Sequence, residues 1–506
     1  MSTATSDGTA RFRHRHITAG LHPNSFRQLG RTGLETSVLG FGAYRVTGTE
    51  QHAAALGHAL RSGINLIDTA SHYSDGDSEQ MVGKVVAKAL QERWVSRDEV
   101  IIVSKVGYLQ GKDLRQIRNQ NLTAKYRDIV HFSPDLWHSL DPDFISDQLT
   151  ATLERLQLSA IDVYLLNNPE FFLATAFRDS QSTGDHFATF YERIGRAFER
   201  LEKEVTRGRI LYYGISSNGF ALPSHHLEHV SIQRLITLSK KICGEQEVPQ
   251  APRFAVVSMP GNLLEPAAFS GKSESGQSPA AEAAMADLGV LVHRPLNALE
   301  GGGLVRLVDT LPPDHDLTLL NQIDELRHLE KAFRAKLLPI IAEAERPFAQ
   351  EALTWSEWFG QAAKDPTPPA TWHRLEQEVI RPALQQTFRQ LAHHFKEEDL
   401  IAWSAWRNEY WPRVLAAVQV ARADTQRLWH KHSQALESRL RPFIPPPLVP
   451  SPLATKVLAV TAGFPCVSAV LNGMRQKAYV DHALLVLRHG TVDLSKEIFN
   501  LSGQLD

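Results

Sequence analysis

The sequence predicts a (β/α)₈ barrel with an α-helical module inserted between its seventh and eighth strands. Short apolar runs alternate with helical segments, eight such runs occur, and one long helical stretch interrupts their rhythm. Alternating strands and helices are typical of a parallel α/β sheet, and eight repeats of that unit are typical of a closed barrel. Ligands bind such barrels at the carboxyl ends of the strands, so the residues just after each run are the candidates for function.

The composition excludes several classes of protein. A chain of 506 residues exceeds one ordinary domain, and its net charge of −2 creates no field that favours nucleic acid or an anionic membrane. No run of about 18 apolar residues is present for a membrane helix. The two cysteines lie far apart without a CxxC pair, which favours a reducing compartment. We therefore expect a cytoplasmic protein that binds a small molecule, with no nucleic-acid or membrane partner.

Four segments are expected along the chain. Residues 1–25 carry several Arg and His residues but no apolar core, so they predict a disordered leader rather than a secretory signal. Residues 26–303 form the first part of the barrel, residues 304–441 the helical insertion, and residues 442–506 the last part of the barrel. Proline clusters punctuate the insertion.

The expected strands are short apolar runs that end at polar or glycine-rich segments. They are residues 38–42, 65–68, 100–105, 161–167, 210–216, 254–257, 289–296 and 467–471. Between the third and fourth strands, residues 107–135 are expected to form a long polar loop. The helix that follows should begin with Asp141 as its N-cap and Pro142 at its first position, and the helix of residues 194–205 should stop at Gly208.

The insertion holds seven of the nine tryptophans, which are Trp355, Trp358, Trp372, Trp403, Trp406, Trp411 and Trp429. We expect these aromatic side chains to form the core of a helix–helix module rather than a ligand platform. Histidines also occur there, including the pair His393 and His394. Because no HExxH or comparable ligand spacing is present, no metal site is predicted.

Three chemically active side chains stand at or just after the ends of the second and third strands. Asp68 ends the second strand, Tyr73 follows five residues later, and Lys105 ends the third strand. A buried lysine requires an anion, which Asp68 supplies, and the ammonium would lower the pKa of a neighbouring Tyr73 phenol. A phenol with a lowered pKa is a better proton donor, which suits the reduction of a carbonyl group. The same three residues are also compatible with a structural ion pair.

Several further sequence motifs occur in a fixed order along the chain. They are residues 39–45 (LGFGAYR), 63–73 (GINLIDTASHY), 78–83 (SEQMVG), 102–105 (IVSK), 153–156 (LERL), 162–170 (DVYLLNNPE), 207–210 (RGRI), 213–216 (YGIS), 262–265 (NLLE), 295–296 (PL) and 473–475 (GMR). On these motifs the chain resembles the aldo-keto reductases, which are NADPH-dependent (β/α)₈ enzymes. The resemblance covers roughly residues 26–304 and 445–487.

The resemblance implies catalytic roles for four residues. Tyr73 would be the general acid, Lys105 would tune it, and Asp68 would hold Lys105. The fourth position, at the end of the fourth strand, is usually a histidine, and here it is Asn167. An asparagine side chain can donate a hydrogen bond to a carbonyl oxygen, but it cannot titrate near neutral pH. Substrate orientation would survive this replacement, whereas a proton relay through the side chain would not.

The resemblance also implies an NADP(H) site. Its residues would be Gly42, Ser216, Ser217, Asn218, Ser258, His293, Pro295, Leu296, Gly473 and Arg475. Ser258 stands where the family usually has a glutamine, and His293 stands where an aromatic ring commonly stacks on the nicotinamide. Arg475 matches the region that binds the adenosine 2′-phosphate, and a guanidinium suits a phosphate, so NADPH is favoured over NADH.

Two hypotheses of function follow. In the first, the protein is an NADP(H)-dependent oxidoreductase that reduces an aldehyde or ketone, or oxidises the matching alcohol. In the second, motivated by Asn167, Ser258 and His293, it is a catalytically weakened nucleotide-binding barrel. That barrel would act as an interaction protein through its Trp-rich insertion.

Overall fold

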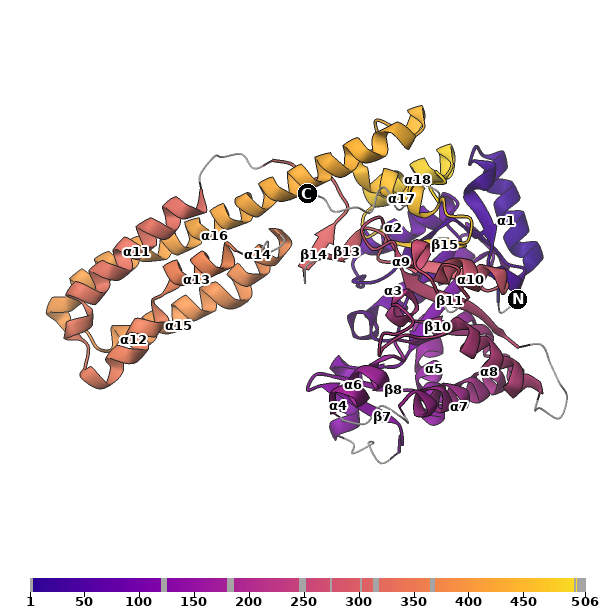
Figure 1. Ribbon diagram of the computed structural model, residues 1–506, viewed down its shortest axis with the longest axis horizontal. Helices are drawn as coiled ribbons and strands as arrows, with labels where there is room; N and C mark the ends of the chain where they lie inside the picture. Colours follow the sequence, from indigo (N-terminus) through magenta and orange to yellow (C-terminus); the bar gives the residue numbers. More distant parts are fainter. Residues whose placement is uncertain are drawn as a thin grey trace. The chain divides into compact units, whose positions relative to one another are not determined.

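The chain divides into two compact units. The structure, a computed structural model, describes residues 3–119, 125–179, 186–244, 252–273, 275–300, 303–312, 318–364, 369–495 and 497. The first unit, here called the barrel unit, comprises Met1–Ala298 and Leu440–Gln504. The second, here called the helical unit, comprises Leu299–Arg439. Figure 1 shows both units, coloured along the sequence.

The barrel unit contains a closed barrel of eight parallel strands. In order around the barrel they are β3 (Leu39–Gly42), β4 (Leu66–Asp68), β5 (Ile101–Val106), β9 (Ile161–Asn167), β10 (Ile210–Ser216), β11 (Phe254–Pro260), β12 (Gly289–His293) and β15 (Ala469–Gly473), which pairs again with β3. Aliphatic side chains from the strands fill the interior, among them Leu66, Val103, Leu165 and Leu291. The predicted eight-stranded α/β barrel is confirmed.

Helices follow the strands and surround the barrel. They include α2 (Glu50–Arg61), α3 (Asp77–Gln91), α5 (Pro142–Leu156), α7 (His186–Thr206), α8 (Ile232–Gly244), α10 (Pro279–Met285) and α18 (Lys477–His489). The predicted cap of α5 is confirmed, because the Asp141 carboxylate accepts hydrogen bonds from the amides of Asp143 and Phe144. Helix α7 ends just before Gly208, whose φ of 72° suits a left-handed position after a helix.

The segment predicted as a disordered leader is instead structured, so that prediction is wrong. Residues Ser6–Thr18 form helix α1, and its Phe12 side chain has no exposed surface. Arg15 donates to both carboxylate oxygens of Glu99, at 2.6 and 3.0 Å. The arginines that suggested a solvated leader therefore belong to a helix whose buried residues, Phe12 and His16 among them, pack on the barrel unit.

The residues ahead of α1 help to close the barrel at the amino ends of its strands. The amide of Ala4 donates to Asp162 Oδ1 at 2.6 Å, and Arg97 donates to Asp162 Oδ2 at 2.8 Å. Ala4 belongs to the same apolar cluster as Leu29, Leu34 and the interior side chains of the strands. The start of the described chain is therefore part of the barrel core.

Replacement of Phe12 by alanine is expected to lower the free energy of unfolding of the barrel unit by about 3 kcal/mol, because it removes a fully buried aromatic side chain. The exposed His14 on the same helix provides the matched control, and His14→Ala should change that free energy by less than about 0.5 kcal/mol. Urea denaturation followed by circular dichroism measures both. Equal transitions for Phe12→Ala and the wild type would restore the disordered-leader interpretation.

The segment between the third and fourth barrel strands also differs from its prediction. It was expected to be a polar loop, but it contains β6 (Tyr108–Leu109), α4 (Gly111–Asn119) and β7 (Ile129–Ser133). Together with β8 (Leu136–Ser139) the two strands form an antiparallel sheet in the order β6-β8-β7. This small sheet brings aromatic side chains to the end of the barrel where β5 and β9 terminate.

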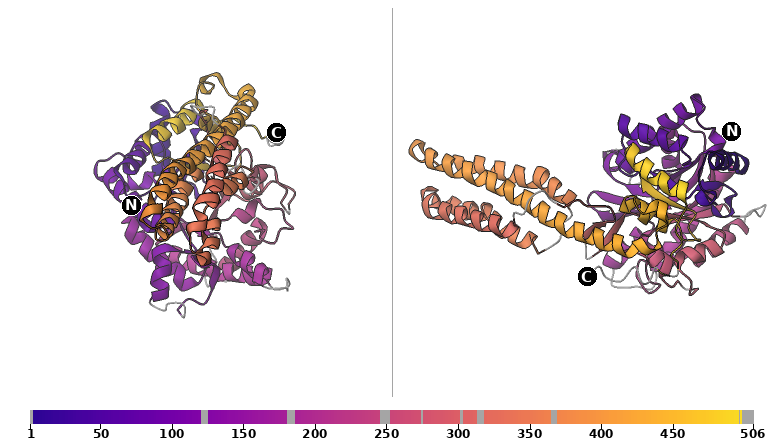
Figure 2. Two further views of the ribbon diagram at one scale, coloured as in Figure 1. Left: turned by 90° about the vertical axis from the view of Figure 1, so that its left-hand side faces the viewer. Right: turned by 90° about the horizontal axis from the view of Figure 1, so that it is seen from above.

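The helical unit lies between β12 and β15 in the sequence, which confirms the predicted insertion between the seventh and eighth barrel strands. Its main helices are α11 (Leu319–Lys336), α12 (Arg346–Ala352), α13 (Trp355–Ala362), α15 (Arg381–Ala392) and α16 (Glu397–Leu440). Figure 1 and Figure 2 show α11 and α15 running alongside the long α16. Among the described residues, no helix combines the length and apolar character that crossing a membrane requires.

The tryptophans of the helical unit form its core, as predicted. Trp372, Trp403 and Trp406 are buried in the central cluster, and Trp355, Trp358 and Trp411 pack against its edge. Their polar atoms have partners inside the unit: Trp406 Nε1 donates to the carbonyl of Leu329, and Trp372 Nε1 donates to Thr425 Oγ1. A satisfied indole N–H is what burial of a tryptophan requires.

Candidate active site

The residues predicted to be functional occupy two continuous arcs at the carboxyl ends of the barrel strands. Asp68 ends β4, Tyr73 follows it, Lys105 lies in β5 and Asn167 ends β9, and these three strands are neighbours in the barrel. The predicted cofactor residues follow the other five strands, β10, β11, β12, β15 and β3, which are also consecutive. The strand order therefore places the predicted catalytic and cofactor residues around the same end of the barrel.

Asp68, Lys105 and Tyr73 meet at the carboxyl end of β4 and β5. Lys105 Nζ lies 2.6 Å from Asp68 Oδ1. It also donates to the carbonyl of Thr69 at 3.0 Å and to Tyr73 Oη at 3.3 Å. Lys105 is 3% exposed and Asp68 is 4% exposed, so this ion pair is almost wholly removed from water. The three N–H groups of the ammonium are then committed, and the phenolic proton of Tyr73 is left to donate elsewhere.

The expected lowering of the Tyr73 pKa by Lys105 is wrong for this structure. Burial raises the pKa of the Tyr73 phenol well above its usual value, and the nearby Asp68 carboxylate raises it further. The physical reason is that the Lys105 ammonium lies closer to the Asp68 carboxylate, at 2.6 Å, than to the Tyr73 phenol, at 3.3 Å. Asp68 therefore compensates most of the Lys105 charge, and Tyr73 remains fully protonated at neutral pH.

A strained turn follows Tyr73 and precedes helix α3. Ser74 and Asp75 have positive φ values of 50° and 54°, in the left-handed region that costs non-glycine residues about 1 kcal/mol or more each. The Asp75 carboxylate lies 3.7 Å from the guanidinium of Arg115 in α4. Strain of this kind persists where surrounding contacts over-determine the backbone, and here it lies directly next to Tyr73.

Asn167 lies where the sequence placed it, at the end of the fourth strand, and it is 5% exposed. Its carbonyl oxygen is 2.7 Å from His138 Nε2, and the backbone passes close to Gly107. A Cβ at Gly107 would lie 2.6 Å from His138 Nε2 and 2.7 Å from the Asn167 carbonyl, so glycine is required there. Among the described residues, none forms a hydrogen bond with the Asn167 side-chain amide, which leaves that amide able to bind a ligand.

An aromatic wall adjoins Tyr73 that the sequence did not reveal. The His72 ring lies 4.8 Å from the Tyr73 ring and stacks on Tyr108 at 4.2 Å between centroids. Tyr108 continues to Phe171, with centroids 5.3 Å apart. Burial lowers the pKa of His72 to about 3, so this imidazole is neutral near pH 7. The wall depends on the β6-β8-β7 sheet, which was not predicted, and therefore no motif could have indicated it.

Three of the predicted cofactor residues contact one another. His293 Nδ1 lies 3.1 Å from Ser258 Oγ, and His293 Nε2 lies 3.5 Å from Asn218 Oδ1. Burial lowers the pKa of His293 to about 3, with smaller contributions from Arg294 and Lys105, so the ring is neutral. In the family that the sequence resembles, these two positions usually hold a glutamine and an aromatic ring. Here Ser258 and His293 occupy them and are hydrogen-bonded to each other.

The two consecutive serines after β10 differ in what they contact. Ser216 pairs in register with Asn167 on one side and with Ser258 on the other. The Ser217 hydroxyl instead donates to Glu170 Oε2 at 2.7 Å and accepts from the amide of Gly219. Ser216 is therefore the serine placed among the other candidate residues, while the Ser217 side chain holds the turn. Glu170 was not predicted as a site residue, although a buried acid three residues after a strand end is a signal that could have suggested it.

The remaining predicted cofactor residues lie at the ends of β3, β12 and β15. Gly42 and Gly473 are register partners, and the space above Gly473 is open to a distance of 4 Å. Arg475 is exposed and lies just before α18. Pro295 and Leu296 follow β12, with Pro295 buried and Leu296 partly exposed. These positions lie along the arc of β12, β15 and β3 and could line an elongated ligand.

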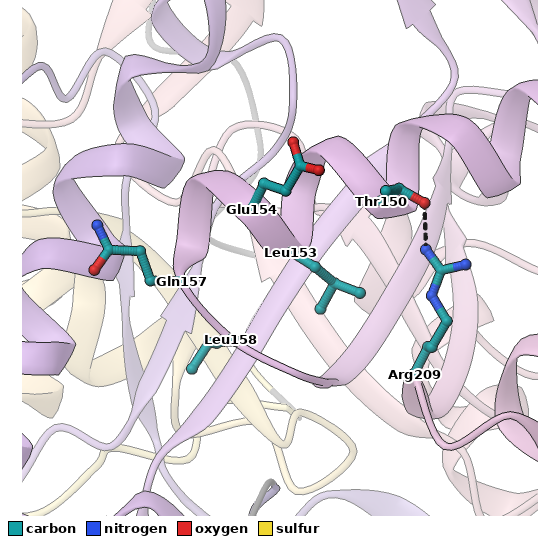
Figure 3. Close-up of a pocket in the computed structure, with 6 residues that line it drawn as sticks. All are labelled: Thr150, Leu153, Glu154, Gln157, Leu158 and Arg209. Atoms are coloured by element: carbon teal, nitrogen blue, oxygen red, sulfur yellow. Dashed lines mark hydrogen bonds between the residues drawn. The ribbon is translucent and has the colours of Figure 1, made fainter.

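Two of the hollows in the described structure bear on the position of the site. One of about 350 Å³ adjoins Tyr73 and is lined by His72, Ser74, Asp75, Asp77, Gln110 and Lys112. The other, of about 520 Å³, lies between the end of α5 and the residue before β10, at the opposite end of the barrel (Figure 3). Its Arg209 is held by Thr150 and Glu204, and it contains no predicted site residue. None of the residues that line the first hollow is a predicted site residue either, so the Asp68–Lys105–Tyr73 cluster defines the candidate site, and the first hollow adjoins it through His72 and Ser74.

Among the described residues, no three His, Cys, Asp or Glu side chains are grouped in a way that could hold a metal ion.

Comparisons with known proteins agree with the barrel and its motifs. Residues 38–229 match the model of the aldo/keto reductase family. The chain is 34% identical over 137 residues to the 6-dehydroglucose reductase of Novosphingobium aromaticivorans, which covers 24% of this chain and 44% of that protein. It is 28% identical over 193 residues to the NADPH-dependent D-xylose reductase of Meyerozyma guilliermondii, covering 37% of this chain and 50% of that protein. The chain thus spans about half the length of these relatives.

One solved structure aligns along nearly the whole chain. The glycerol dehydrogenase of Gluconobacter oxydans covers 96% of this chain and 98% of its own, with a TM-score of 0.47 and 14% identity.

Proposed function

We propose that this protein is an NADP(H)-dependent oxidoreductase that reduces an aldehyde or ketone, or oxidises the matching alcohol, since residues 38–229 match the model of the aldo/keto reductase family. The single observation that carries the proposal is the Asp68–Lys105–Tyr73 cluster, with its ion pair at 2.6 Å and its phenol at 3.3 Å from the ammonium. The family match alone is compatible with a binding protein, whereas this buried cluster supplies a proton donor.

Tyr73 is the group from which a carbonyl oxygen would receive its proton. Its phenol is protonated at neutral pH, because burial raises its pKa, and its proton is not donated to Lys105. Bound NADPH would supply the hydride that adds to the carbonyl carbon. As the carbonyl π bond breaks, the oxygen takes the Tyr73 proton, and the hydrogen bond from Lys105 stabilises the phenolate that remains. Solvent then returns a proton to the phenolate.

Asn167 orients the carbonyl in this proposal. Its side-chain amide has no hydrogen-bond partner among the described contacts and can donate to a substrate oxygen. Since an amide does not titrate, Tyr73 is left as the acid at this position. The residues of the second arc, from Ser216 to Arg475, are proposed to hold the cofactor, and the protein is proposed to act in the cytoplasm.

The donor set of the second arc fits a dinucleotide. Ser216, Asn218 and the linked Ser258–His293 pair offer amide and hydroxyl groups for a carboxamide, and the exposed Arg475 offers a guanidinium for a phosphate. The open space above Gly473 allows close approach to the backbone.

Titration of the purified protein with NADPH and with NADH, followed by cofactor fluorescence, tests the proposal. We expect saturable binding that is tighter for NADPH. Arg475→Ala is expected to weaken NADPH binding about tenfold and NADH binding little, because only NADPH carries the 2′-phosphate. Protein that binds neither cofactor in this assay would contradict the proposed function.

A panel of aldehydes and ketones separates the enzyme from an interaction protein. The observation that favours the second candidate is Asn167 at the position usually held by a histidine. Wild-type protein that binds NADPH but reduces no carbonyl, together with an Asn167→His variant that does, would support an interaction protein. Turnover by the wild type supports the enzyme.

A further inference from the structure

Glu170 is a buried acid at the centre of the candidate site. It lies three residues after the end of β9 and is 2% exposed. Its carboxylate accepts three hydrogen bonds, from Asn168 Nδ2 at 2.7 Å, from Ser217 Oγ at 2.7 Å and from the amide of Asn218 at 2.8 Å. A single side chain after the fourth strand therefore holds the turn that follows the fifth strand.

The turn held by Glu170 presents the residues proposed to bind the nicotinamide. Its Asn218 side chain lies 3.5 Å from His293, and His293 is hydrogen-bonded to Ser258. On the other side, the Tyr108 hydroxyl donates to Asn168 Oδ1 at 3.0 Å, so the same network reaches the aromatic wall beside Tyr73. Glu170 thus connects the two arcs of the candidate site.

The charge of this carboxylate is not balanced by a nearby cation. Within the residues that the structure describes, no Lys, Arg or His lies within 4.0 Å of its oxygens, and all three partners are neutral donors. Burial raises the pKa of Glu170 above its usual value, and the hydrogen bonds from Ser217, Asn168 and the Asn218 amide oppose that rise by favouring the ionised form. A buried carboxylate without a counter-ion attracts whatever cation is placed next to it.

We propose that Glu170 makes the site discriminate between the oxidised and the reduced nicotinamide cofactor, by attracting the cationic ring of NADP⁺ and not the neutral ring of NADPH. The inference rests on the proposed function, because it requires that the turn at Ser217 and Asn218 borders the nicotinamide. Glu170 is a positioning residue and does not contact the reacting atoms. Besides holding the turn at Ser217 and Asn218, it sets the relative affinity of the site for NADP⁺ and NADPH.

Isothermal titration calorimetry of NADP⁺ and NADPH against wild-type and Glu170→Gln protein tests the proposal. Glutamine has the same shape and keeps acceptors for Asn168 and for the Asn218 amide, but it removes the charge. The dissociation constant for NADP⁺ is expected to rise about tenfold in Glu170→Gln, with that for NADPH changing less than about twofold. The matched control is Ser217→Ala, which removes one hydrogen bond and keeps the charge, so it should weaken both cofactors by the same factor.

An equal change of both dissociation constants in Glu170→Gln would overturn the proposal and leave Glu170 with a purely structural role. If Glu170→Gln does not fold, Glu170→Asp keeps the charge and must keep the wild-type ratio of the two constants, and a changed ratio would overturn the proposal. Failure of the proposed function is distinguishable, because wild-type protein would then bind neither NADP⁺ nor NADPH. If the wild type binds both cofactors and Glu170→Gln leaves the ratio of the two dissociation constants unchanged, the role proposed for Glu170 is wrong and the proposed function still stands.

Discussion

The Tyr73→Phe variant is expected to lose at least about a hundredfold in turnover while binding NADPH as tightly as the wild type does. The substitution removes one hydroxyl and keeps the ring that packs beside Tyr44 and His72. Because the phenol is the only proton donor assigned to the carbonyl oxygen, its loss should reduce kcat and kcat/KM together. Steady-state kinetics with a carbonyl substrate and fluorescence titration of NADPH provide the two measurements.

Tyr44→Phe serves as the control for that experiment. Its ring lies 5.2 Å from the Tyr73 ring, but its side chain is 58% exposed and its hydroxyl forms no hydrogen bond with the residues that the structure describes. We expect less than a twofold change in turnover from that variant, although the chemical change is identical. If both variants lost turnover equally, aromatic packing around Tyr73 and not its proton would be responsible. If Tyr73→Phe kept full activity, the acid would have to be another group.

Replacement of Lys105 by methionine is expected to have the second large effect, on both turnover and stability. Methionine removes the hydrogen bond that stabilises the Tyr73 phenolate, so turnover should fall at least tenfold. It also leaves the Asp68 carboxylate buried without its partner, which should lower the free energy of unfolding by about 3 to 5 kcal/mol. NADPH affinity should change much less than turnover, since Lys105 acts on the phenol.

The double variant Asp68→Asn with Lys105→Met separates the two effects. It replaces the buried ion pair by two neutral side chains, and therefore most of the lost stability should return in urea denaturation. Turnover should not return, because the ammonium is still absent. Recovery of activity along with stability would show that Lys105 has only a structural role. A parallel loss of NADPH binding and turnover in Lys105→Met would instead assign Lys105 to the cofactor.

The barrel and the positions of its chemical groups could be predicted from the sequence because both depend on local pattern. Apolar runs of strand length mark the strands, and a polar residue at the end of a run marks the face where ligands bind. Asp68, Lys105 and Asn167 were therefore placed correctly at the ends of three strands that prove to be neighbours. The size of the inserted helical unit was equally evident from its composition.

The contacts that the sequence could not reveal are those between segments far apart in the chain. Helix α1 resembles a solvated leader in sequence because its basic residues are evident there and their acidic partners, such as Glu99 for Arg15, are not. The role of Glu170 requires knowing that the turn at Ser217 and Asn218 lies next to it. Such contacts arise from the closure of the barrel, and no local motif encodes them.

The prediction that Lys105 lowers the pKa of Tyr73 is wrong for a related reason. Sequence reasoning placed a cation next to the phenol and inferred a lower pKa from that pair alone. The structure adds two further terms, burial of the phenol and the carboxylate of Asp68, and both raise the pKa. The direction of this pKa shift depends on the distances among Tyr73, Lys105 and Asp68, which lie within a few ångströms of one another. Residue types alone do not give those distances.

The position of the insertion has a consequence for how the chain folds during synthesis. Strand β15 fills the last place between β12 and β3, and the bond from the Val290 amide to Ser468 Oγ joins residues 178 apart in sequence. Until β15 has been synthesised, the barrel cannot close, and the other seven strands can form only an open sheet with two unpaired edges. The helical unit is synthesised before β15 and consists of helices with local contacts, so it is expected to fold before the barrel closes. Barrel closure, in which β15 pairs with β12 and β3, is then expected to be the slow, aggregation-prone step of folding during synthesis.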